Sequence, residues 1–168
     1  ADDVLRLYPA RNNDDVPEAM NKLLTVSAFG APARFMAASM EKKKSPGYLY
    51  YFTQVSPAAG KKGWGAFHGA EIMYVFQTGA KMGFAQADLA LSKLMASTWA
   101  RFAKTGDPAA DNLTPWTPYR EVTDQVMVFG TPRVGEAPNP LAAQCDLMDR
   151  LAVEKRGDPA AVPVRKDR

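Results

Sequence analysis

Residues 48–53 read Tyr-Leu-Tyr-Tyr-Phe-Thr, and this run constrains the fold more than any other part of the chain. A β-strand sends alternate side chains to opposite faces, and here both faces carry aromatic or large apolar groups. That pattern is typical of a strand that is buried on both sides in a largely parallel sheet covered by helices. The other good strand candidate is the run Val-Met-Val-Phe at residues 126–129. Two strands do not make such a sheet, so either the pattern hides further strands or the rest of the sheet belongs to another polypeptide.

Helical spacing of apolar residues, together with helix start and stop signals, predicts helices before, between and after these strands. The predicted helices cover residues 2–7, a segment that starts at 15–18, and residues 31–44, 70–76, 84–104 and 138–152. Residues 55–67 and 107–119 are predicted to be loops. The elements indicate an α/β fold, with one domain over residues 1–152 and a mobile, charged tail over residues 153–168.

Composition excludes several classes of protein. Apolar residues make up 46% of the 168 residues, which is typical of a folded chain, and no apolar run approaches the length of a membrane-spanning helix. The first residues lack the features of a signal peptide. The net charge of +3 is spread along the chain without a basic stripe between stacking aromatic residues, so nucleic-acid binding rests on charge alone and is disfavoured. The single Cys145 cannot form an internal disulfide.

His68 is the only histidine of the chain, and it is the candidate functional residue. Histidine exchanges a proton readily near neutral pH. Gly63, Gly65 and Gly69 surround it, so the backbone can turn tightly and present the ring on a loop. The alternative is a hydrogen-bonded structural histidine. Glu71 lies three residues later, but one histidine makes a zinc or iron site improbable, and we expect no metal and no cofactor.

Four motifs occur in the same order along roughly residues 20–150. They are residues 48–54, the Phe-His-Gly-Ala-Glu segment at 67–71, the Trp-Ala-Arg-Phe-Ala-Lys-Thr-Gly-Asp-Pro segment at 99–108, and Trp-Thr-Pro-Tyr at 116–119. Together they resemble the C-terminal third of type-B carboxylesterases, the relatives of cholinesterases and para-nitrobenzyl esterases. The resemblance implies an α/β-hydrolase fold. This chain would supply its last sheet strand or strands and the helices that cover them, and would be incomplete alone.

The resemblance also implies roles for residues around the histidine. His68 matches the base of the family's catalytic triad, and Gly69 and Glu71 would support its loop. Trp64, Phe67 and Met73 lie beside it in the sequence and are candidates for the pocket that binds the acyl or alcohol part of a substrate. Core packing is the alternative for each of these three side chains. For Trp99, Phe102 and Trp116 we expect core packing.

The other catalytic parts of such an enzyme are missing from the sequence. The nucleophile of an α/β-hydrolase stands in a Gly-x-Ser-x-Gly elbow. None of the chain's serines has this context; they are Ser27, Ser39, Ser45, Ser56, Ser92 and Ser97. We also find no oxyanion-hole loop, and the triad acid would lie near or beyond the N-terminus. The nucleophile and acid would then come from an N-terminal portion, either a separate chain or a part lost by cleavage or truncation.

These inferences predict hydrolysis of a small-molecule carboxylic ester, with the isolated chain inactive. The alternative is a non-catalytic, cholinesterase-like interaction or assembly module. We expect no nucleic-acid partner and no membrane span. The family resemblance allows a secreted or periplasmic location, but the sequence alone does not fix the compartment.

Overall fold

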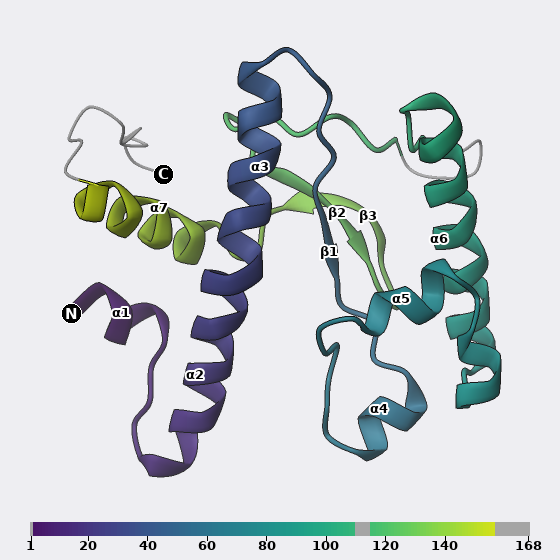
Figure 1. Cartoon of the computed structure of the whole chain (residues 1–168). Coiled ribbons are helices and arrows are strands. Elements are labelled where there is room, and N and C mark those ends of the chain that lie inside the picture. The colour runs from purple at the N-terminus through teal and green to yellow at the C-terminus, as the bar shows by residue number, and fades with distance from the viewer. Residues whose placement is uncertain (1, 110–114, 157–168) are drawn as a thin grey trace. The chain divides into compact units, whose positions relative to one another are not determined.

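The computed structural model of the chain describes residues 2–109 and 115–156, and the chain divides into two compact units (Figure 1). The first unit consists of Ala1–Gly47 and Asn139–Arg168, and the second is Tyr48–Pro138. The second unit contains the sheet and the histidine. The single domain that the sequence predicts over residues 1–152 stays a prediction.

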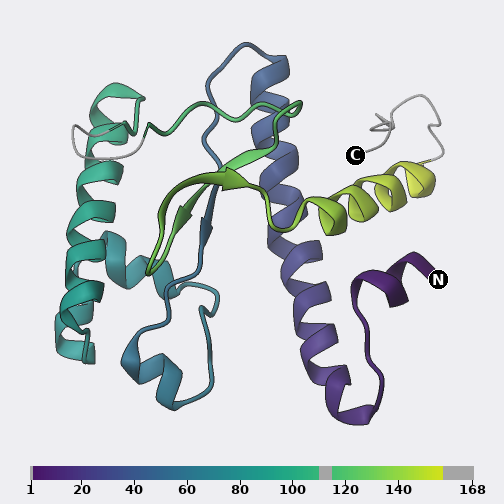
Figure 2. The ribbon, with the colours of Figure 1, turned by 180° about the vertical axis from the view of Figure 1, so that it is seen from behind.

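The sheet of the second unit has three strands, β1 (Tyr50–Phe52), β2 (Gln125–Phe129) and β3 (Val134–Pro138), in that order. The first two are parallel, as predicted, with Tyr51 opposite Val128. The predicted burial of this strand on both faces is not observed, because Tyr50, Tyr51 and Phe52 are each only half-buried in a sheet of three strands among the described residues. Strands β2 and β3 are antiparallel and form a hairpin that Figure 2 shows from behind.

Strand β3 was not predicted, because its sequence Val-Gly-Glu-Ala-Pro is rich in residues that are depleted in strands. Pairing with β2 holds these residues extended. In the connection between the two strands, a Cβ atom on Gly130 would overlap the hydroxyl group of Thr53. This close approach between the hairpin turn and the segment after β1 requires glycine.

Helices fill the interval between β1 and β2. They are α4 (Pro57–Lys61), α5 (Ala70–Val75), a 3₁₀ turn at Gly79–Met82, and α6 (Gln86–Thr105). The last ends at Gly106, which has a φ of 73°, so the predicted helix stop is confirmed. Helix α4 lies in a segment that was predicted to be a loop. Its start signal is the Ser56 hydroxyl, which accepts the Ala59 N–H at 3.3 Å, ahead of a proline at the first helical position.

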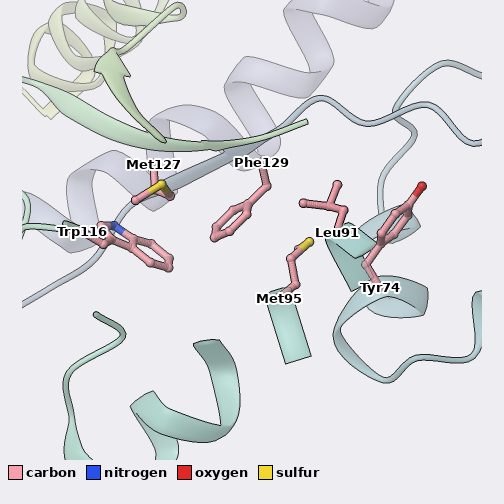
Figure 3. Packing of buried hydrophobic residues seen from close by; sticks show 6 residues of the cluster. All are labelled: Tyr74, Leu91, Met95, Trp116, Met127 and Phe129. Carbon is pink, nitrogen blue, oxygen red and sulfur yellow. The ribbon is translucent and has the colours of Figure 1, made fainter. Parts of the chain in front are cut away.

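The core of the second unit lies between the sheet and helices α5 and α6. Its buried members are Tyr74, Leu91, Met95, Trp116, Met127 and Phe129 (Figure 3). The prediction of core packing is confirmed for Trp116, which is buried, and Trp99 packs against the same cluster. Phe102 differs, because its side chain is 45% exposed although its ring contacts that of Tyr48.

The first unit is helical. Its elements are α1 (Asp2–Leu7), a 3₁₀ turn (Asn13–Asp15), α2 (Val16–Thr25), a π-helical turn (Val26–Gly30), α3 (Ala31–Lys42) and α7 (Ala142–Arg156). Helices α2 and α3 were predicted as separate, and the π turn joins them without a break.

Helix α7 is held against α3 by charge and by apolar packing. The Arg34 guanidinium is almost completely buried and lies 2.7 Å from a carboxylate oxygen of Asp146 and 3.3 Å from one of Asp149. Cys145 packs with Ala31 in the same interface. The helix continues to Arg156, so the charged tail does not begin at residue 153, and Val153 is buried. The mobility predicted for the tail concerns residues 157–168, which lie outside the described part of the chain.

No helix within the described residues is long and apolar enough to cross a membrane.

Candidate functional site

His68 lies in the second unit, two residues before α5, at the end of a connection that starts after β1. We call residues 55–69 the His68 loop. The turn at its end is closed by the N–H of Ala70, which donates to the carbonyl of Phe67 at 3.0 Å. Gly69 sits in this turn with a φ of 84°, a left-handed conformation that strains other residues. The turn holds His68 at the surface, where its side chain is exposed.

An aromatic pair lies in the same loop as the histidine. The rings of Trp64 and Phe67 meet edge to face, with centroids 5.5 Å apart. Trp64 is 56% exposed, and the Lys62 ammonium lies 4.2 Å from the centre of its ring. Such a pair presents apolar surface in the loop that carries His68, and apolar surface is what a pocket for part of an ester would need. Their binding role stays a prediction.

Met73 and Glu71, the other predicted site residues, belong to α5 rather than to the loop. Both are half-buried. Burial raises the pKa of Tyr50 on β1, and the charge of Glu71 raises it further. The support that Glu71 would give to the His68 loop stays a prediction.

A buried carboxylate is hydrogen-bonded to residues on both sides of the loop, and it was not predicted from the sequence. Asp88, in the first turn of α6, is 1% exposed. One of its oxygens accepts hydrogen bonds from the side-chain amide of Gln54 at 2.8 Å and from the hydroxyl of Tyr74 at 2.7 Å. Its other oxygen accepts the N–H of Ala85 at 2.9 Å. The carbonyl oxygen of the Gln54 side chain accepts the N–H of Thr131 at 2.7 Å, so the network reaches the turn of the β2–β3 hairpin.

This network leads to a prediction about alkaline pH. Burial, and then the hydrogen bond to Asp88, raise the pKa of Tyr74 above the ordinary value of 10.0. Above that pH the unfolded chain loses the tyrosine proton while the folded chain keeps it, so this stability is present below pH 10 and is lost as the pH rises. We expect urea unfolding to require less urea at about pH 11 than at about pH 8, and Tyr74→Phe to weaken this dependence. An equal dependence in the variant would contradict the prediction.

Within residues 2–109 and 115–156, no group of three or more His, Cys, Asp or Glu side chains is placed to hold a metal ion. Two of the chain's serine hydroxyls have structural roles in the second unit. That of Ser56 caps α4, and that of Ser92 donates to the carbonyl of Tyr74 at 2.8 Å. Neither stands in the sequence context of a nucleophile elbow.

Comparison with known proteins agrees with this geometry. The profile of the carboxylesterase family matches residues 3–148. Fumonisin B1 esterase of Sphingopyxis macrogoltabida is 34% identical over 136 residues, which are 75% of this chain and 24% of that protein. Carboxylesterase 1C of Rattus norvegicus is 32% identical over 129 residues, 72% of this chain and 23% of that protein. The chain thus spans about a quarter of the length of these relatives.

A relative whose name is not that of an esterase also matches. Neuroligin-2 of Homo sapiens is 37% identical over 94 residues, which are 51% of this chain and 11% of that protein. The resemblance inferred from the four sequence motifs is confirmed by these matches.

Proposed function

Because this chain belongs to the carboxylesterase family, we propose that it is the C-terminal part of a serine esterase of the α/β-hydrolase fold, with His68 as the base of the catalytic triad. The observation that carries the proposal is the setting of His68. The only histidine of the chain stands exposed in a glycine-bounded turn, after a strand of the sheet and directly before a helix. This is the setting that an imidazole needs to reach a serine hydroxyl on another part of the protein.

In this proposal the chain moves one proton. The imidazole of His68 takes the proton of the serine hydroxyl as its oxygen attacks the ester carbonyl, and later returns a proton to the leaving alcohol. The turn at Gly69 fixes where the ring stands, and Glu71 supports that turn. Trp64, Phe67 and Met73 line one side of the pocket for the acyl or alcohol part of the substrate.

The serine, the acid and the oxyanion hole come from an N-terminal portion of the same esterase. That portion is either joined to this chain in the complete protein or is a separate partner chain. Two observations support an incomplete unit. The sheet within the described residues has three strands, and β1 pairs with β2 alone among them. A small sheet with an open edge is consistent with one part of an α/β-hydrolase domain, in which further strands would extend the sheet.

Assays on the chain alone and on the complete protein test the proposal. We expect the 168-residue chain to hydrolyse a chromogenic short-chain ester no faster than free imidazole, because none of its serines stands in a Gly-x-Ser-x-Gly elbow. The complete protein should turn the ester over and be labelled by a fluorophosphonate on a serine outside these residues. Native mass spectrometry would reveal whether that portion is a separate chain. A label on a serine within the chain, or an inactive complete protein, would overturn the proposal.

A non-catalytic interaction or assembly module is the second candidate, and the match to neuroligin-2, whose name is not that of a hydrolase, favours it over unrelated functions. The two candidates differ in the N-terminal portion. An intact Gly-x-Ser-x-Gly elbow there indicates an enzyme, and its loss indicates a binding protein.

A further inference from the structure

We propose that Asp88 is a positioning residue that holds both ends of the His68 loop. The two hydrogen bonds to one of its oxygens carry this inference. Gln54, which donates at 2.8 Å, immediately precedes the loop. Tyr74, which donates at 2.7 Å, lies in α5, the helix that immediately follows the loop. A single carboxylate oxygen therefore connects the entry and the exit of the segment that carries His68.

The simpler explanation, that Asp88 only caps the start of α6, accounts for one of its three bonds. Capping needs the bond from the N–H of Ala85 to the other oxygen. It does not need the bonds from Gln54 and Tyr74, which join α6 to the residues on either side of the loop. Ser92, one turn further along α6, adds a second link by donating to the carbonyl of Tyr74 at 2.8 Å.

The loop depends on its ends because most of it lies at the surface. Its own backbone bonds are local turns, such as the N–H of Trp64 to the carbonyl of Ala59 at 3.0 Å. The side chains of Asp88, Gln54 and Tyr74 are buried, each at 8% exposure or less. Hydrogen bonds to a buried charged group are short and strong, so these anchor points are more rigid than the loop between them.

The consequence for the reaction rests on the proposed function. If His68 is the base, the distance between its imidazole and the serine depends on where the ends of the loop are fixed, and a displacement of about 1 Å in such a geometry can cost on the order of a hundredfold in rate. Asp88 would set that distance without touching the substrate.

The test uses Tyr74→Phe as the main variant and Asp88→Asn as the second. The first removes one hydroxyl and leaves the ring, which packs against Phe52 and Phe84. Thr98→Val is the matched control, because it removes a fully buried hydroxyl from α6, the helix that carries Asp88, and that hydroxyl donates to the carbonyl of Leu94 within the helix rather than to a residue beside the loop. Two readouts need no activity: hydrogen exchange at the amides of Trp64 and Ala70, and relaxation of the imidazole signal, which is unambiguous because His68 is the only histidine.

We expect the amides of Trp64 in the loop and Ala70 at its end to exchange on the order of tenfold faster in the two variants, the imidazole signal to sharpen, and amides of α3 in the first unit to keep their rates. Unchanged loop exchange in Tyr74→Phe would overturn the proposal even if Asp88→Asn fails to fold. An equal acceleration in Thr98→Val would also overturn it, because the effect would then be a general loss of stability.

Activity gives a separate readout. In the complete esterase Tyr74→Phe should lower kcat and leave KM nearly unchanged. A loosened loop with an unchanged kcat would overturn the role of Asp88 in the reaction. A complete protein that stays active without His68 would refute the proposed function but leave the link between Asp88 and the loop intact.

Discussion

Replacing His68 with alanine is expected to lower kcat of the complete esterase by a factor on the order of ten thousand to one million. Without the imidazole, the serine hydroxyl keeps its proton and attacks the ester poorly. Members of a catalytic triad act as a unit, so the loss of the base alone removes most of what the triad contributes. KM should change little, because His68 handles a proton rather than binding the substrate. Steady-state kinetics with a chromogenic ester measure both constants.

Two controls make this result specific. Because the side chain of His68 is exposed, its loss should change the free energy of unfolding by about 0.5 kcal/mol or less, so reduced activity cannot come from unfolding. Lys61→Ala removes an exposed basic side chain from the same loop and should leave kcat as in the wild type. If the complete protein retains its esterase activity with alanine at position 68, the histidine is not the base.

Much of the fold could be predicted from the sequence where the local signal is strong. Strand β1 carries bulky side chains on both faces and was predicted within residues 48–53, and α6 shows both its apolar stripe and its glycine stop. Strand β3 has neither signal, because a Gly-Glu-Ala-Pro sequence is extended only through its pairing with β2. The extent of the sheet therefore depended on tertiary contacts that no local pattern contains.

The candidate site also contains one residue that the sequence identifies and one that it does not. His68 could be found because it is unique and surrounded by glycines, and because the motif at residues 67–71 resembles that of a known family. Asp88 could not, since its partners lie 14 and 34 positions away in the sequence, and a lone acid in the first turn of a helix indicates only a helix start. Residues that position a functional side chain through long-range contacts have no local motif by which a single sequence could identify them.

The largest effect on stability is expected for Phe129→Ala. Phe129 is fully buried at the end of β2, in the cluster with Trp116 that Figure 3 shows. Its ring centroid lies 5.5 Å from that of Trp116 and 5.6 Å from that of Trp99. Removing the ring loses its burial and leaves a cavity among rigid aromatic neighbours that cannot close it. We expect a loss of about 3–5 kcal/mol in the free energy of unfolding, a large part of the stability of a typical domain.

Urea unfolding followed by tryptophan fluorescence measures this loss in the second unit alone, because all three tryptophans of the chain, Trp64, Trp99 and Trp116, belong to Tyr48–Pro138. Val122→Ala is the control, since that side chain is 73% exposed and its loss should shift stability by about 0.5 kcal/mol or less. Phe129→Leu, which keeps part of the buried volume, should fall between the two. If Phe129→Ala unfolds at the wild-type urea concentration, the aromatic packing between sheet and helices is not what stabilises this unit, and the site it carries must be held by other contacts.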